Sequence, residues 1–207
     1  FVYTIPKRFR CFFRWDRKLL GGLSRAAWET TREVFAAVLG EGAEPGFIAS
    51  IQTFGDLVHW HPHIHALVSD GAFGPDGVFR PLPPMAVEPF RRLWEHKIFR
   101  LLLNAGRITE DTVEGMRAWK HSGFGVHKEV RLAEGDSAGV ERLAQYITRA
   151  PFSQARLRVG NDRVLYISGK GAIHAFPNGR RANLPKGSPR TYESDGQPLI
   201  RNISTAV

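Results

Sequence analysis

Cysteine is nearly absent from this sequence, because Cys11 is the only one among 207 residues. A single thiol cannot form an internal disulfide, and it excludes a cysteine-based zinc cluster within these residues. Long apolar runs are missing too, since no stretch approaches the roughly 18 apolar residues that a membrane-spanning helix needs. No signal-peptide pattern follows the basic start of the chain. We therefore expect a cytoplasmic protein without a membrane partner and, because residue 1 is not methionine, a piece of a longer chain.

Positive charge is present in excess, with a formal net charge of +9 and a sequence pI of about 10.2. Residues 1–34 contain eight basic and three acidic residues, and residues 170–207 contain six and two. The residues between these segments are neutral in sum. Basic clusters of this kind are typical of a polyanion partner, most often nucleic acid. The alternative is a basic surface that has no partner.

Apolar periodicity predicts an antiparallel sheet with helices on its faces, an α+β fold. The expected strands cover residues 1–5, 46–54, 62–69, 124–132 and 163–168. The expected helices cover residues 16–39, 87–104, 109–120 and 137–149. Gly21 and Gly22 suggest a break in the first helix. Because residues 170–207 lack apolar periodicity, we expect one domain over residues 1–169 and a disordered basic tail after it.

Four histidines fall within residues 59–65, the densest group of possible metal ligands in the chain. Pro62 cannot donate a hydrogen bond to a neighbouring strand, so it marks the expected start of the strand. His63 and His65 would then project from one face, since side chains two residues apart in a strand share a face. Two adjacent imidazoles favour a divalent-metal or phosphate site. The alternative is a surface or core pair without a ligand.

A third ligand is needed for such a metal site, and Gln52 on the preceding strand is one candidate. Its amide could instead form a hydrogen bond with the backbone. A different arrangement, a zinc hydrolase that uses His59, His61 and His63, would need a carboxylate base, and Asp56 is the nearby acidic residue.

The candidate nucleophile is Tyr146, which lies on the expected helix 137–149. Its phenol is at the border of the apolar stripe formed by Val140, Leu143, Ala144 and Ile147. Arg142 and Arg149 lie on the same side of this helix, and two guanidiniums beside a phenol suit a phosphodiester substrate. The alternative is a tyrosine that packs at the helix border.

Several motifs, in the same order, resemble the insertion-sequence-91 family of rolling-circle transposases, within the His-hydrophobic-His (HUH) endonuclease superfamily. They lie over about residues 1–168 and are Phe1–Arg8, Ile51–Asp56, His61–Val68 with Asp70-Gly71, Arg91–Lys97, His121–His127 and Arg142–Ser153.

The resemblance implies an HUH-like catalytic domain that cleaves and joins single-stranded DNA at transposon ends. It implies that His63 and His65 bind a divalent metal, Mg²⁺ or Mn²⁺, that the family's glutamine falls on Gln52, and that Tyr146 forms a 5′-phosphotyrosine. The protein would then associate with DNA in a bacterial nucleoid. The residues expected along the DNA backbone are Lys7, Arg8, Arg10, Arg142 and Arg149, and Trp60 and Trp119 are candidates for base stacking.

The sequence departs from the family in three places. Many members have a second tyrosine four residues earlier, where this chain has Arg142, so it resembles the single-tyrosine branch. The zinc-binding module typical of the family's amino terminus is not among these residues, and the segment after Gly169 does not resemble the family's usual ending. The alternative function is therefore a decayed transposase fragment that only binds nucleic acid.

Overall fold

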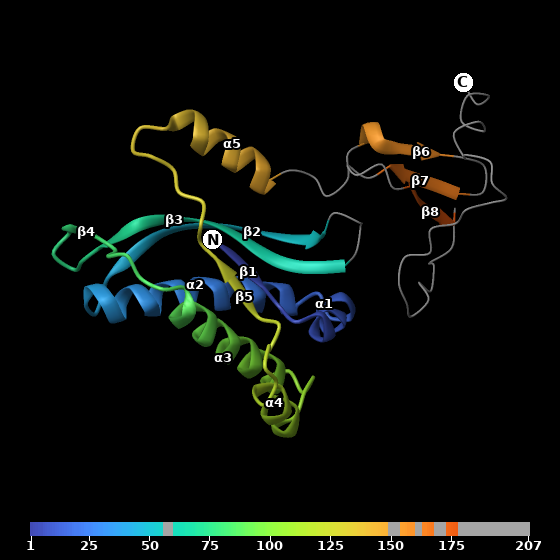
Figure 1. The fold of residues 1–207 in the computed structure, drawn as a ribbon, viewed down its shortest axis with the longest axis horizontal. Helices are drawn as coiled ribbons and strands as arrows, with labels where there is room; N and C mark the ends of the chain where they lie inside the picture. Colours follow the sequence, from blue (N-terminus) through green and yellow to red (C-terminus); the bar gives the residue numbers. More distant parts are fainter. Residues whose placement is uncertain (56–59, 149–153, 160–162, 168–172, 178–207) are drawn as a thin grey trace. The chain divides into compact units, whose positions relative to one another are not determined.

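An antiparallel sheet forms the centre of the first of the two compact units into which the chain divides, Phe1–Pro151 and Phe152–Val207. The structure is a computed structural model that describes residues 1–55, 60–148, 154–159, 163–167 and 173–177. The strands of the first unit are β1 (Val2–Thr4), β2 (Glu44–Phe54), β3 (Trp60–Phe73), β4 (Phe79–Pro81) and β5 (Gly125–His127). They follow the order β2-β3-β1-β5, and β4 pairs with β3 (Figure 1).

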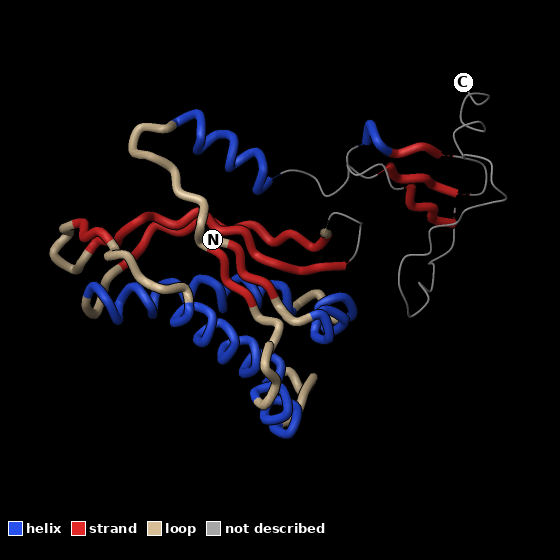
Figure 2. Tube along the Cα trace, viewed as in Figure 1, coloured by secondary structure: helices blue, strands red, loops and turns tan. Residues whose placement is uncertain are grey.

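Helices lie on both faces of this sheet, which confirms the expected α+β class. They are the 3₁₀ turn η1 (Lys7–Phe9) and the helices α1 (Arg10–Trp15), α2 (Leu19–Leu39), α3 (Glu88–Asn104), α4 (Glu110–Arg117) and α5 (Ser137–Thr148). α2 and α3 lie on one side of the sheet and α5 lies on the other, as Figures 1 and 2 show. Among the described residues, no helix has both the length and the apolar content needed to cross a membrane.

The main hydrophobic core fills the space between the sheet and α2 and α3. Its largest fully buried side chains are Trp94, Tyr3, Phe9, Phe13, Phe35, Phe90, Phe99, Ile5, Leu23, Ile64, Ile98 and Leu102. Two of them have polar atoms, and both atoms are satisfied: the Tyr3 hydroxyl lies 2.8 Å from Thr31 Oγ1, and Trp94 Nε1 donates to the Thr4 carbonyl at 2.8 Å. The residues of this core cluster do not include His63 or His65, which are also buried.

Helix α2 runs unbroken through Gly21 and Gly22, so the expected break is wrong. The reason lies in helix packing, because a Cβ atom on Gly22 would come within 2.6 Å of Leu101 Cδ1 on α3. Glycine at this position lets the two helices approach closely. A Cβ atom on Gly21 would meet nothing within 4 Å.

Other elements differ in length from the sequence prediction. β3 begins at Trp60 and ends at Phe73, beyond both ends of the expected strand 62–69, and β5 keeps only three residues of the expected strand 124–132. Neither α1 nor β4 was predicted. Both are short, three to six residues long, so apolar periodicity has little room to develop in them.

The second unit contains a separate antiparallel sheet of β6 (Leu157–Val159), β7 (Arg163–Ile167) and β8 (Ile173–Pro177), preceded by the 3₁₀ turn η2 (Gln154–Arg156). β7 matches an expected strand. β8 pairs with β7 although it falls within the expected tail 170–207. The remainder of that tail, residues 178–207, lies outside the described residues.

Candidate functional site

The site begins with His63 and His65, which lie on the central strand β3. Their Nε2 atoms are 3.0 Å apart and both side chains are buried. Ile64, between them, points into the main core and is fully buried. The alternation of a strand therefore places the two imidazoles on the face opposite the core.

A backbone hydrogen bond orients the His63 ring. His63 Nδ1 lies 2.7 Å from the His61 carbonyl oxygen, which can only accept, so Nδ1 carries the proton. The lone pair of His63 Nε2 then faces His65. Metal-binding histidines are commonly held in this way, with the second ring nitrogen donating to a carbonyl.

The two imidazoles fit a divalent cation. Two nitrogens bound at roughly 2.1 Å to one ion, about 90° apart, would lie about 3.0 Å from each other, which is the observed separation. No cluster of three or more histidine, cysteine or acidic side chains capable of holding a metal occurs in the described part of the chain. Any further protein ligand from the described residues must then be of another type, such as an amide oxygen.

Gln52 lies directly across from His63 in the pairing of β2 with β3. Its Nε2 donates to the carbonyl of Tyr146 at 3.4 Å and to the carbonyl of Ile147 at 3.2 Å. The backbone hydrogen bond considered as the alternative for Gln52 is thus present. It uses only the amide nitrogen, so the amide oxygen remains the atom that a metal would use.

Tyr146 on α5 meets the histidine pair across the sheet face. Its ring centroid is 5.5 Å from that of His65, and the two ring planes are nearly perpendicular at 84°. The side chain is 43% exposed. Tyr146 and the histidines are about eighty residues apart in sequence, and the fold brings them together because α5 lies over this face (Figure 2).

The expected apolar stripe of α5 is only partly buried. Ile147 is buried and Leu143 is half-buried, but Ala144 is exposed and Val140 is 43% exposed. The helix rests on the sheet through its last turn, where Gln52 and His65 contact it. The contact of α5 with the sheet is therefore narrow and centred on Tyr146.

The expected strand start at Pro62 would leave His61 in the turn before it, away from the pair, and this expectation is wrong. β3 begins at Trp60, and its pairing with β2 shifts register between Gln52 and Phe54, which accommodates Pro62 within the strand. The His61 ring lies 4.9 Å from the His63 ring, centroid to centroid. His61 Nε2 is buried, and no described group forms a hydrogen bond with it.

The electrostatics around these histidines favour the neutral imidazole. Burial, more than any other cause, lowers the pKa of His61 to about 4, and the positive charges of Arg10 and His63 act in the same direction. Burial also lowers the pKa of His63, with a smaller contribution from Arg10. Neutral imidazoles are the form that binds a metal.

The other expected site residues lie in different places. Lys7 and Arg8 are exposed, and the Arg8 guanidinium lies 5.3 Å from the centroid of the Trp119 ring, which is itself 53% exposed. Arg142 is exposed and lies 3.9 Å from the Asp136 carboxylate. Asp56, His59 and Arg149 lie outside the described residues.

Arg10 was expected along the DNA backbone, and the structure places it close to the histidines. There its positive charge adds to the effect of burial in lowering the pKa of His61 and His63. Its backbone carbonyl accepts a hydrogen bond from Trp60 Nε1 at 2.7 Å, which fixes the start of α1 to the start of β3. In the sequence, the signal for this contact is a tryptophan, Trp60, within the histidine run.

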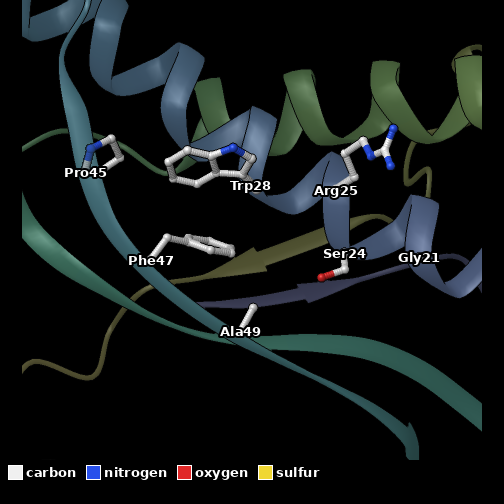
Figure 3. A pocket seen from close by; sticks show the side chains of 7 residues that line it. All are labelled: Gly21, Ser24, Arg25, Trp28, Pro45, Phe47 and Ala49. Carbon is white, nitrogen blue, oxygen red and sulfur yellow. The ribbon is translucent and has the colours of Figure 1, made fainter.

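A separate hollow of about 470 Å³ lies between α2 and β2. Its lining residues are Gly21, Ser24, Arg25, Trp28, Pro45, Phe47 and Ala49 (Figure 3). Phe47 and Ala49 pair with Val68 and Ala66, whereas Gln52 pairs with His63. The hollow is therefore on the α2 face of the sheet and is not part of the histidine site.

Comparisons with known proteins agree with the sequence motifs. The profile of a protein family described as "Putative transposase" matches residues 46–171, which is more than half of the chain. The "Transposase for insertion sequence element IS801" of Pseudomonas savastanoi pv. phaseolicola is 27% identical over 169 residues, 75% of this chain and 40% of that protein. "Putative transposase y4qJ" of Sinorhizobium fredii is 39% identical over 77 residues, 37% of this chain and 19% of that protein.

The chain thus spans less than half the length of these curated relatives. No solved structure matches the chain. The matched residues 46–171 include both histidines, Gln52 and Tyr146. The resemblance that the motifs indicated is confirmed, and the chain belongs to this transposase family.

Proposed function

We propose that this unit cleaves and joins single-stranded DNA through a covalent bond to Tyr146, as a rolling-circle transposase does. The observation that carries the proposal is the meeting of a partly exposed phenol with a pair of buried imidazoles whose Nε2 atoms converge. A nucleophile beside a site that fits a cation is the arrangement needed for transfer of a phosphodiester.

In this mechanism the Tyr146 hydroxyl oxygen attacks the scissile phosphorus. The new bond joins Oη to phosphorus, the bond from phosphorus to the 3′-oxygen breaks, and the 3′-oxygen gains the proton that the phenol loses overall. The 5′ side of the strand stays on the protein as a phosphotyrosine, which conserves the bond for rejoining. The reverse attack by a 3′-hydroxyl restores the strand and the phenol.

His63 and His65 would hold a divalent cation, Mg²⁺ or Mn²⁺, with Gln52 as the third protein ligand. Such a cation neutralises charge on the phosphate when it is bound. The His61 carbonyl keeps the His63 ring in the orientation and tautomer that presents Nε2. Gln52 in addition holds the last turn of α5, so that one side chain links the ligand set to the nucleophile.

Tyr146→Phe tests the proposal. We expect wild-type protein, incubated with Mn²⁺ and a labelled single-stranded oligonucleotide from a transposon end, to form an adduct that survives denaturing electrophoresis. Tyr146→Phe should form none, while its DNA affinity stays within about twofold, because only a hydroxyl is removed. Tyr166→Phe, a tyrosine of β7 in the second unit, is the matched control and should form the adduct as wild type does.

An adduct with Tyr146→Phe would assign the nucleophile to another residue. Wild-type protein that binds DNA but forms no adduct under any metal condition would instead favour the alternative, a decayed transposase that only binds nucleic acid.

A further inference from the structure

Two buried polar atoms beside the histidine pair have no hydrogen-bond partner among the described residues: Arg10 Nε and His61 Nε2. Buried polar atoms in folded proteins are nearly always satisfied, so a pair of exceptions in one place needs a physical reason. The only other buried side-chain nitrogen or oxygen without a partner in the described part of the chain is Thr30 Oγ1, on α2.

The two atoms belong to one neighbourhood. The Trp60 indole donates to the Arg10 carbonyl at 2.7 Å, and His61 is the next residue on β3. The guanidinium is close enough to act electrostatically on both His61 and His63. Arg17 adds another cation, with its guanidinium 5.8 Å from the centre of the Trp60 ring.

Where the structure describes the chain, neither Arg10 nor Arg17 of this neighbourhood forms an ion pair with an acidic side chain. The guanidinium cannot lose its proton, and Arg10 is half-buried, so water screens its charge only in part. A water molecule could accept a hydrogen bond from Arg10 Nε but would leave the charge unbalanced.

A group that accepts hydrogen bonds would satisfy the buried Nε, and an anionic group would also balance the charge of Arg10. Arg10 Nε can only donate, and His61 Nε2 donates when it carries a proton. A non-bridging phosphate oxygen meets both requirements, and arginine is well suited to bind phosphate.

The position separates this group from the one that reacts. Contacts between rings lead from His61 to His63, to His65 and to Tyr146, with successive centroid separations of 4.9, 4.8 and 5.5 Å. Arg10 and His61 are at one end of this series and Tyr146 is at the other. A phosphate at Arg10 is thus not the one beside the phenol.

We propose that Arg10 and His61 form a binding site for a second phosphate of the DNA strand, next to the scissile one. The site rests on the proposed function, because it takes the same strand that Tyr146 attacks. Its role is to fix the register of the strand, so that the scissile phosphate and no other lies between Tyr146 and the histidine pair.

The test measures binding rather than cleavage, so that it can succeed or fail independently of the chemistry. Tyr146→Phe protein is titrated with single-stranded oligonucleotides, each of which has one phosphate replaced by an uncharged methylphosphonate, at successive positions around the cleavage point. We expect one non-scissile position at which this replacement weakens binding by roughly tenfold or more, the usual effect of losing a hydrogen bond to a charged group.

Arg10→Gln in the same background should weaken binding of unmodified DNA by a similar factor. At that one position, the methylphosphonate should then have no further effect, while its effects elsewhere persist. Arg14→Gln is the matched control, since Arg14 lies on α1 but is exposed, with its guanidinium 5.3 Å from the Trp15 ring centre. At every position, a methylphosphonate should weaken DNA binding by Arg14→Gln as much as it weakens binding by the parent protein.

Three results would overturn the proposal. The first is a loss of affinity in Arg10→Gln that equals the parent's loss at every methylphosphonate position, which means that Arg10 contacts no single phosphate. The second is coupling of Arg10 to Asp56 in a double-mutant cycle of thermal unfolding, which means that a carboxylate is the partner. The third is a loss of Mn²⁺ affinity in His61→Gln as large as in His63→Ala, measured by calorimetry, which makes His61 a metal ligand.

Arg10→Lys provides a second variant if Arg10→Gln does not fold. Lysine keeps the charge but lacks the fixed Nε donor, so we expect a smaller loss than tenfold, still confined to the same phosphate. If the methylphosphonate at that position weakens binding equally in Arg10→Lys and in the parent protein, a specific guanidinium contact is contradicted.

Discussion

His61 and His63 are neutral, largely buried imidazoles, and their lowered pKa values make folding depend on pH. Above pH 6.5 both the folded and unfolded chains leave His61 neutral. As the pH falls from 6.5 towards 4, the unfolded chain takes up a proton that the folded chain does not. The free energy of unfolding therefore decreases over this window. The slope should stay below the limit of about 1.4 kcal/mol per pH unit for one full proton, because solvent reaches part of the ring.

Urea unfolding between pH 4 and 8, in a chelator so that no metal is bound, measures this dependence. His61→Gln should flatten the slope, whereas His121→Gln, at an exposed position, should leave it unchanged. An unchanged slope in His61→Gln would show that the folded state protonates His61 readily.

At the residue scale, much of the site was predictable. His63 and His65 follow from period-two spacing in a strand, and Tyr146 follows from the family motif. His61 was misplaced because Pro62 normally ends a strand, and a register shift that permits proline within a strand leaves no simple sequence pattern. Arg10 was expected along the DNA backbone, but its place beside His61 could not be predicted, since it depends on a contact between residues fifty positions apart.

At the scale of elements, Gln52 holds the last turn of α5 to the sheet by hydrogen bonds. Gln52 donates to two carbonyls that the helix itself cannot satisfy. Gln52→Ala should therefore loosen α5, at a cost of about 1 kcal/mol in local stability. Backbone amides of α5 should exchange with deuterium roughly fivefold faster, while those of α2 should not change.

Ser50→Ala is the control for this experiment, because Ser50 lies on β2 opposite His65, whereas the two hydrogen bonds to the last turn of α5 come from Gln52. Equal exchange rates in Gln52→Ala and wild type would show that these two hydrogen bonds do not hold the helix.

The long elements were predicted well and the short ones poorly. α2, α3 and α5 each show several turns of apolar spacing, so their bounds agree with the sequence within a few residues. β5, with three residues, depends on pairing with β1 rather than on its own alternation. β8 was missed because its Gly- and Pro-rich surroundings are typical of a loop.

At the scale of the molecule, the clusters of charge at the two ends of the sequence predict salt-sensitive DNA binding. The expected tail began at residue 170, but a truncation there would remove β8. Deleting residues 178–207 instead keeps all three strands of the second sheet and removes five basic and two acidic residues. For each phosphate that the shortened protein no longer neutralises, the slope of log affinity against log salt should fall by roughly 0.7 on single-stranded DNA.

Fluorescence anisotropy at 50 to 300 mM salt measures this slope. We expect the truncated protein to show a shallower slope and still to form the covalent adduct, since Tyr146 and the histidines are all in the first unit. A slope that is the same with and without residues 178–207 would mean that these residues do not contact the strand.

The two faces of the sheet in the first unit have different roles. Its α2 and α3 face contains the core on which folding depends, whereas its α5 face contains the side chains proposed for the chemistry. Under the proposed function, a substitution such as Tyr146→Phe should therefore remove cleavage and leave the fold intact. Copies inactivated in this way would persist in a cell as intact proteins that still occupy transposon ends. They would compete with active copies, and inheritance of such a copy would be dominant-negative.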